Sequence, residues 1–370
     1  MPASFVHLRL HTEYSLVDGL VRIKPLVKTL VGMNMPAVAV TDQNNMCSLV
    51  KFYKNAMGAG IKPIAGADIQ VAEGDEAPWK LTLLCRDRSG YLALSRLLSR
   101  AWMEGHRHDG VVVRPQWLAE ANEGLFALAG RHSQAGLLAA GNRHDLASQW
   151  LHDWQRHFDD RFHLELTRCG LDGEEAFNAF ALHAAGERGI PVVASNDVRF
   201  LDREDFGAHE ARVCIATGRV LDDPRRPREY SAEQYLKSPE EMAALFADVP
   251  EALENTVELA KRCNLQLSLG TYYLPDFPVP EGHTLESWIG EEARRGPAGP
   301  RGLRHDDGAV PRPEGQRGGD HGGATVLLLD FVGASADLHR GGETFQIPFP
   351  RADSGFVEII DIEHQTGGRG

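Results

Sequence analysis

The first polar cluster of the chain stands at the end of its first apolar run, Phe5–Leu10. The order Leu8-Arg9-Leu10-His11 places an arginine and a histidine where a metallohydrolase would carry His-x-His. Neutral imidazole can bind a metal ion, whereas a guanidinium stays protonated and offers only donors. The segment therefore indicates a metal-dependent phosphoesterase type of site in which an arginine has replaced a ligand.

The elements that must position these residues follow an alternating pattern over the first two hundred residues. Short β-rich runs alternate with amphipathic, helix-like stretches, which favours a parallel β/α barrel or an open α/β sheet. The predicted strands are Phe5–Leu10, Ala37–Thr41, Pro63–Val71, Leu81–Cys85, Leu125–Ala129, Phe162–Leu166 and Pro191–Ser195. The predicted helices are Arg22–Met33, Asn45–Ala59, Tyr91–Trp102, Asp145–Phe158 and Glu174–Arg188.

Polar side chains follow four of these runs directly. His11 follows the first, Asp42 the second, Arg131 the fifth, and Asp197 with Arg199 the seventh. In a β/α barrel such positions meet at the C-terminal rim, where active sites lie. An aspartate after a strand can equally be the cap of the next helix. Four rim positions together favour a shared site.

Composition and charge limit the remaining possibilities. The 370 residues include 42% hydrophobic residues, enough for a core, and carry a formal charge of −13, so the chain is no general polycation. Its five scattered cysteines contain no CxxC pair, so neither a zinc ribbon nor a disulfide framework is indicated. The sequence shows no signal pattern and no apolar run of membrane-spanning length, so we expect a cytoplasmic protein without a membrane partner.

The composition changes near Gly296, and 16 of the 38 glycines lie in residues 296–370. Residues 221–295 are predicted to be mostly helical, with a helix start at Ser238-Pro239. Residues 296–370 form a Gly/Pro/Arg-rich tail that we expect to be disordered or read out of frame. Two runs in the tail, Thr325–Phe331 and Phe345–Ile362, could form strands but have no obvious partner.

Several long motifs closely resemble one family, the bacterial replicative DNA polymerase III alpha subunits. The resemblance runs from about Ser4 to Gly296, so the chain looks like the start of such a protein, truncated and frameshifted after about Gly296. The matching motifs are Phe5–Ser15, Ala39–Asp42, Val50–Tyr53, Gly60–Ile64, Asn196–Phe200, Leu221–Pro224 and Asn255–Asn264.

In this family the N-terminal region is the PHP (polymerase and histidinol phosphatase) domain. The resemblance therefore implies a distorted seven-stranded β/α barrel over residues 1–220, followed by a helical link over 221–295 toward a polymerase palm. In the family the palm holds two magnesium ions with a Pro-Asp-x-Asp-x-Asp-Phe motif. That motif does not occur in these 370 residues, so we expect no polymerase chemistry and no cofactor in them.

Nine side chains bind three metal ions in the metal-binding PHP domains that the chain resembles. Carried over residue by residue, His11, Asp18 and Asp197 match that pattern, and Asp68 stands where the family has Glu. These four are weak candidates for a remaining metal site.

The other five ligand positions are changed, and four of the replacements are cations. Lys80 belongs to this set by resemblance alone, because it precedes its apolar run. The replacements are Arg9, Gln43 (after Asp42), Lys80, Arg131 and Arg199.

Carboxylates that share a rim repel one another and need positive charge, which metal ions supply in the active relatives. Here the four cations can pair with Asp18, Asp68 and Asp197, and bidentate arginine pairs suit buried carboxylates. We therefore predict a metal-free core of ion pairs. The alternative is that the arginines point into solvent.

Two hypotheses about function remain. The first is a structural module that binds other replisome parts, since the resemblance implies docking of the proofreading exonuclease subunit, and DNA binding only in the full-length protein. The second is a residual metal-dependent phosphoesterase or 3′–5′ exonuclease. The second needs one complete site of three or four His or carboxylate ligands.

Overall fold

The computed structural model describes residues 4–108, 110–270, 279–295, 330–331, 335–340 and 343–348. The chain divides into two compact units, Met1–Leu269 and Gly270–Gly370. The candidate site residues all belong to the first unit. In the described part of the chain, no helix combines the length and the apolar character needed to cross a membrane.

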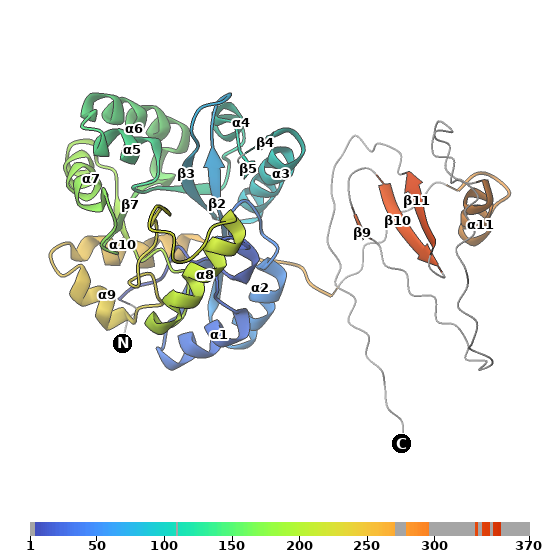
Figure 1. Cartoon of the computed structure of the whole chain (residues 1–370), viewed down its shortest axis with the longest axis horizontal. Helices are drawn as coiled ribbons and strands as arrows, with labels where there is room; N and C mark the ends of the chain where they lie inside the picture. Colours follow the sequence, from blue (N-terminus) through green and yellow to red (C-terminus); the bar gives the residue numbers. More distant parts are fainter. Residues whose placement is uncertain are drawn as a thin grey trace, which may run out of the picture. The chain divides into compact units, whose positions relative to one another are not determined.

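A curled six-stranded sheet forms the centre of the first unit (Figure 1). Its strand order is β1-β2-β3-β6-β7-β8, and each strand coincides closely with a predicted run. Their apolar residues point to both faces, as expected for strands covered on both sides. The strands are β1 (Ala37–Val40), β2 (Lys62–Val71), β3 (Trp79–Cys85), β6 (Leu125–Ala129), β7 (Phe162–Thr167) and β8 (Val192–Ser195).

The predicted first strand, Phe5–Leu10, is not a regular strand. It makes one parallel bridge to β1 at His7↔Val38 and another to the segment after β8 at Leu10↔Val198. This segment, Phe5–Leu10, is called the first segment below; it lies between the two edges of the sheet and closes the barrel. The α/β class and the distorted barrel are confirmed, and the count of seven holds only when this irregular segment is included.

The sheet is not all parallel, which corrects one alternative drawn from the alternating pattern. β3 runs antiparallel to both of its neighbours, β2 and β6, whereas the other strand pairs are parallel. A short connection of Ala72–Pro78 joins β2 to β3 and contains no helix, so the two strands form a hairpin.

Helices cover the outside of the sheet (Figure 1). Side-chain caps fix several of their starts: Asp87 accepts from the backbone N–H groups of Ser89 and Gly90, and Ser238 forms a capping box with Glu241. The helices of this unit are α1 (Ile23–Gly32), α2 (Leu49–Gly58), α3 (Arg88–Glu104), α4 (Pro115–Glu120), α5 (Gln134–Ala140), α6 (His144–Phe158), α7 (Glu174–Arg188), α8 (Phe206–Thr217), α9 (Pro239–Leu245) and α10 (Pro250–Arg262).

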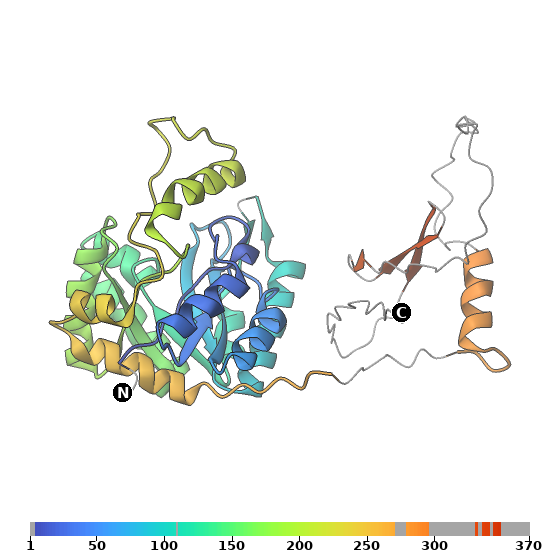
Figure 2. The same cartoon turned by 90° about the horizontal axis from the view of Figure 1, so that it is seen from below.

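The interior of the barrel has an apolar end and a charged end. At the apolar end, inward-facing residues of the first segment and the strands pack with Leu259, Ala260 and Cys263 at the end of α10. The charged end is covered by the segment that contains α8 and the loop after it, which stands out from the barrel in Figure 2. His209, Tyr230 and Gln234 of this segment reach the charged residues.

In the second unit the structure describes α11 (Leu285–Arg295) and three short strands, β9 (Asp330–Phe331), β10 (Ser335–Arg340) and β11 (Glu343–Pro348). β10 pairs antiparallel with both β9 and β11, so the expectation that the strand-like runs of the tail have no partner is wrong. The predicted disorder of Gly296–Gly323 lies outside the described residues.

Candidate functional site: a buried charged cluster

Arg9 is the central cation of the charged end of the barrel. Its side chain is 5% exposed, and its Nη2 lies 2.7 Å from Asp68 Oδ2 on β2. Its Nη1 lies 3.0 Å from Glu165 Oε2 on β7, and its Nε lies 3.2 Å from Asp197 Oδ1 after β8. One guanidinium therefore joins carboxylates from three separate parts of the sheet.

Arg199 is the second cation, and it is among the largest fully buried side chains of the chain. Its Nη1 donates to Asp18 Oδ2 at 2.6 Å, and its Nη2 donates to Asp197 Oδ1 at 2.5 Å. The same Nη1 also contacts His11 Nδ1. The ring of Tyr230 covers the guanidinium, whose Cζ lies 5.8 Å from the ring centroid.

His11 lies between two carboxylates. Its Nδ1 lies 2.8 Å from Asp18 Oδ1, and its Nε2 lies 2.8 Å from Asp68 Oδ2. A carboxylate only accepts, so both ring nitrogens can donate at once only in the imidazolium form. The geometry thus favours a positively charged His11, which adds a third cation to Arg9 and Arg199.

Every carboxylate oxygen of Asp18, Asp68 and Asp197 has a donor from the chain. The arginines and His11 supply most of these donors, as described above. Thr82 Oγ1 donates to Asp68 Oδ1 at 2.5 Å, and Gln234 Nε2 donates to Asp197 Oδ2 at 2.9 Å. The six residues Arg9, His11, Asp18, Asp68, Asp197 and Arg199, together with Glu165, are called the charged cluster below.

The electrostatics of the charged cluster follow from this pairing. Burial alone raises the pKa of each of the three aspartates, but the neighbouring cations outweigh it and hold all three below their ordinary range. Arg199 lowers the pKa most for Asp18 and Asp197, and Arg9 lowers it most for Asp68. The three carboxylates are therefore ionised, and three cations balance them.

Glu165 differs from the aspartates. Burial raises its pKa, and the attraction of Arg9 does not offset this effect because Asp197 and Asp68 repel a further negative charge. Glu165 is therefore the carboxyl of the cluster that binds a proton most readily. The carboxyl lies close to Gly130, where an added Cβ would be 2.5 Å from Glu165 Oε2.

The backbone at Asp197 is constrained as well. Its φ of 46° lies in the left-handed region, which non-glycine residues adopt at a cost of about 1–3 kcal/mol. The conformation turns the carboxylate back to meet both Arg9 and Arg199. The surrounding contacts must supply the energy that holds this geometry.

The donor set does not fit a metal ion. A divalent cation needs lone pairs, but those of the three aspartates already face N–H and O–H donors, and an imidazolium at His11 has no free lone pair to offer. In the described part of the chain, no group of three or more His, Cys, Asp or Glu side chains is arranged to hold a metal ion. The four weak metal candidates are thus members of an ion-pair network.

Two of the predicted cations do not pair with these carboxylates. Arg131 Nη1 instead donates to the backbone oxygen of Asp172 at 3.2 Å, so its predicted pairing is wrong. Lys80 lies on β3, two residues before Thr82 on the same face, yet no ion pair joins its ammonium to a carboxylate within the described residues. Lys80 therefore faces the charged cluster but forms no ion pair with its carboxylates.

Asp42 and Gln43 lie beside the charged cluster and have local structural contacts. Asp42 accepts from the backbone and hydroxyl of Thr12, from Ser15 Oγ at 2.9 Å and from Ser48 Oγ at 2.5 Å. It joins the loop after the first segment to Ser48 before α2 through hydroxyl contacts, and α2 has no side-chain cap hydrogen bond, so the capping interpretation that the sequence left open is wrong for Asp42. The backbone of Gln43 bridges to Asp68, and its N–H donates to Ser15 Oγ.

Sequence reasoning missed several members of this site. Glu165 lies inside the predicted strand Phe162–Leu166, where a charged residue between two leucines is a signal of an inward-facing polar group. Tyr230 and Gln234 come from the loop after α8 but lie outside its Leu221–Pro224 motif. His132 was also overlooked: burial and the nearby Arg131 and Lys80 lower its pKa to about 2.

Comparison with protein families assigns this architecture. Residues 7–169 match the family model described as the PHP domain. This chain carries a PHP domain. The match spans most of the first segment, the strands β1 to β7 and most of the charged cluster, and it leaves out Asp197 and Arg199.

Curated relatives extend the likeness beyond the PHP domain. The DNA polymerase III subunit alpha of Xylella fastidiosa (strain Temecula1) is 58% identical over 97% of this chain and 32% of its own length. The Pseudomonas fluorescens protein of the same name is 56% identical over 78% of this chain, and that of Escherichia coli (strain K12) is 48% identical over 79%. The chain spans about a quarter to a third of the length of these relatives.

The extent of similarity differs between these relatives. A match over 97% of the chain must continue past Gly296, so the expected end of the resemblance at that residue is wrong for the Xylella protein.

Among solved structures, an amidohydrolase from Chromobacterium violaceum covers 56% of this chain at 14% identity with a TM-score of 0.37, a likeness too slight to support an argument.

Proposed function

We propose that this chain is the PHP-domain part of a replicative DNA polymerase alpha subunit and acts there as a structural and partner-binding module without metal-dependent catalysis. The observation that carries the proposal is the saturation of the three aspartates by donors from the chain. Arg9 and Arg199 occupy the centre of the barrel mouth, and their guanidinium groups fill the space between the carboxylates.

Arginine suits this position better than lysine does. Its planar fork reaches several carboxylates at fixed geometry, and it remains charged at any pH that the folded protein meets. Two guanidinium groups and one imidazolium can therefore hold together the loops and strands that metal ions hold together in a metal centre. The mouth of the barrel keeps a fixed shape without an external ligand.

The experiment that tests this proposal is a metal and activity analysis of the purified 370-residue chain. After dialysis against Zn²⁺ or Mn²⁺ and removal of excess metal, we expect much less than one ion per chain. Hydrolysis of p-nitrophenyl phosphate and of a 3′-labelled DNA strand should stay at the level of a blank, with or without EDTA.

The second hypothesis, a residual phosphoesterase or exonuclease, predicts the opposite outcome. It requires stoichiometric metal and EDTA-sensitive hydrolysis that disappears in Asp68→Asn but persists in Asp153→Asn, a control on the exposed side of α6. That combination would overturn the proposal. A further arm uses a primed DNA template with Mg²⁺, on which we expect no extension because the palm motif is absent from these residues.

The partner part of the proposal rests on the family. We propose that the module binds the proofreading exonuclease subunit of its own replisome, and that this contact needs the intact barrel. Co-elution of the two purified proteins in gel filtration supports it. Independent elution at micromolar concentrations of both, with the barrel shown to be folded, contradicts it.

A further inference from the structure

Three nitrogen-bearing side chains at the charged end of the barrel are not used by the charged cluster. They are Lys80 at the start of β3, and Arg131 and His132 just after the end of β6. All three side chains are half-buried. The backbone N–H of Lys80 donates to the backbone oxygen of His132 at 2.8 Å, so the two stretches of chain lie side by side.

Most of the donors of these side chains are unused. Within the described residues, no hydrogen bond or ion pair joins the Lys80 ammonium or the His132 ring to another group. Arg131 makes one hydrogen bond, from Nη1 to the backbone oxygen of Asp172 at 3.2 Å, which leaves its Nε and Nη2 groups available. A lysine has three N–H donors and an arginine has five, so several donors at this place need an acceptor.

Lys80 faces the interior of the barrel mouth. Successive residues of a strand point to opposite faces, so Lys80 shares its face with Thr82, whose hydroxyl donates to Asp68. Burial lowers the pKa of the Lys80 ammonium, and the positive charges of Arg199 and Arg9 add to this effect against the attraction of the aspartates. The ammonium is thus partly withdrawn from water, near other cations and without a paired anion.

The charges at this end of the barrel do not balance. The three aspartates of the charged cluster are balanced by its three cations, as described above. Lys80 and Arg131 add two positive charges, whereas Glu165 can add only one negative charge even when it is ionised. At least one positive charge is therefore in excess beside donors without a partner. A charge withdrawn from water is costly unless it is paired, so this arrangement favours a bound anion.

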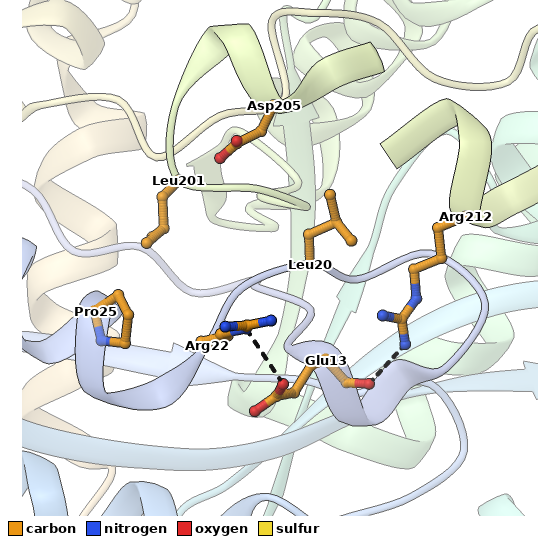
Figure 3. Close-up of a pocket in the computed structure, with 7 residues that line it drawn as sticks. All are labelled: Glu13, Leu20, Arg22, Pro25, Leu201, Asp205 and Arg212. Carbon is orange, nitrogen blue, oxygen red and sulfur yellow. Dashed lines mark hydrogen bonds and ion pairs between the residues drawn. The ribbon is translucent and has the colours of Figure 1, made fainter. Parts of the chain in front are cut away.

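Figure 3 shows a pocket that differs from this place, because its arginines already have partners. The pocket has a volume of about 300 Å³. Its Arg22 forms an ion pair with Glu13, with 3.8 Å between Nε and Oε2. Its Arg212 donates to the backbone oxygens of Leu16 and Glu13 at 2.8 and 2.9 Å, and the acid Asp205 also lines the pocket. The cations without an acceptor lie at the barrel mouth instead.

We propose that Lys80, Arg131 and His132 form a metal-free binding site for a phosphate group, carried by inorganic phosphate or by a small phosphate monoester. This inference goes beyond the proposed function, since a structural module needs no ligand at the barrel mouth. A phosphate group has oxygens in several directions and carries up to two negative charges, so donors from two separate stretches of chain can bind it together. A carboxylate has two oxygens in one plane and a single charge.

The three residues contribute different interactions to this site. The Lys80 ammonium supplies a compact positive charge, and the free guanidinium nitrogens of Arg131 supply donors in a fixed plane. Burial together with Arg131 and Lys80 lowers the pKa of His132 to about 2, so the free protein holds a neutral ring with one N–H donor. The site therefore binds phosphate through side-chain nitrogens alone.

The test is calorimetric titration of the full chain with sodium phosphate in about 0.15 M KCl and EDTA. Salt at this concentration screens nonspecific attraction, and EDTA removes metal ions that could bridge the phosphate to a carboxylate. We expect saturable binding of one phosphate per chain, and acetate should bind at least about tenfold more weakly.

Two variants assign the binding to the proposed residues. Lys80→Gln and Arg131→Gln should each weaken phosphate binding at least about tenfold, the effect of one lost hydrogen bond to a charged group. The matched controls Lys24→Gln on α1 and Arg225→Gln in the loop after α8 change exposed cations and should bind as the wild type does. Urea unfolding checks that each variant is folded.

A second measurement uses the wild-type chain and does not depend on the folding of a variant. Reductive methylation modifies accessible lysine amines, and mass spectrometry of the digested chain reports the rate at each lysine. Phosphate should slow the methylation of Lys80 at the concentrations that saturate the calorimetric signal, and it should leave the rate at Lys24 unchanged.

Titration with thymidine 5′-monophosphate distinguishes the two sources of the phosphate group. Binding at least as tight as that of inorganic phosphate identifies a monoester as the ligand, and weaker binding identifies free phosphate. Unchanged affinity in folded Lys80→Gln or Arg131→Gln, equal binding of acetate, binding that requires the absence of EDTA, or no binding by the folded chain overturns the proposal. The proposed function fails instead on bound metal and hydrolysis, so the two can fail separately.

Discussion

Replacement of Arg9 by alanine is the sharpest test of the charged cluster. The change removes the cation that contacts Asp68, Glu165 and Asp197 and leaves two ionised aspartates with fewer donors. Breaking a buried ion pair by removing one partner costs about 3–5 kcal/mol. Because the Arg9 side chain is only 5% exposed, solvent screening reduces this value little.

The assay is urea unfolding followed by tryptophan fluorescence. Trp79 on β3 packs edge-on against Trp150 and Trp154 of α6, so their signal reports on the barrel. With an m-value of about 3 kcal/mol/M for a unit of this size, the expected loss moves the midpoint down by about 1–2 M urea. The matched control Arg225→Ala, whose side chain is 87% exposed, should change stability by less than about 0.5 kcal/mol.

A double-mutant cycle separates an ion-pair core from a general packing effect. If Arg9 and Asp68 stabilise each other, Arg9→Ala combined with Asp68→Asn should cost less than the sum of the two single changes, with a coupling of about 1–3 kcal/mol. A loss below about 1 kcal/mol for Arg9→Ala, or strictly additive effects, would refute the interpretation of the cluster as a mutually dependent core.

Three further predictions concern titration and loop structure. Burial and Arg199 lower the pKa of His11, but Asp18 and Asp68 raise it more. The stabilisation from the charged ring is therefore complete below pH 6.5 and is lost as the pH rises through the raised pKa. In urea unfolding at increasing pH, His11→Gln should remove part of this alkaline loss of stability. Burial lowers the pKa of His163 to about 4, so the free energy of unfolding of the wild type should fall by up to about 3 kcal/mol between pH 6.5 and 4. His163→Phe should not show this fall, and parallel pH profiles of the two proteins would count against the prediction. Asp42→Asn should cost about 1–3 kcal/mol and speed amide exchange in the loop that contains Ser15, with unchanged exchange as the contrary result.

The strands were predictable because each is a short apolar run between turn residues. β6 (Leu125–Ala129) begins and ends where the sequence indicated, and β7 differs by one residue. The first segment could not be predicted in the same way, since Phe5–Leu10 has the composition of a strand but pairs at only two bridges. Its irregular backbone turns both Leu8 and Arg9 toward the barrel interior, which a regular strand with period two does not allow.

The candidate site was predictable only in part. Pairing of Arg9 and Arg199 with the aspartates follows from the need to neutralise buried carboxylates, and the structure confirms it. Arg131 carries the same charge but donates to the backbone oxygen of Asp172, outside the cluster. Which of these partners an arginine reaches depends on the local direction of the backbone. Tyr230 and Gln234 could not be found from the sequence, because their loop has no periodicity and reaches the site through the fold.

The separation in sequence of the cluster members explains why the chain retains so many buried charges. Arg9 joins residues 59, 156 and 188 positions away, and Arg199 reaches back to Asp18. Apolar residues could fill the same volume, but they would not fix the direction of the loop at Asp18 or the strained turn at Asp197. A buried ion pair contributes little net stability, but removal of one partner leaves an uncompensated buried charge and costs about 3–5 kcal/mol. On this argument the network is maintained because it holds the mouth of the barrel in one shape.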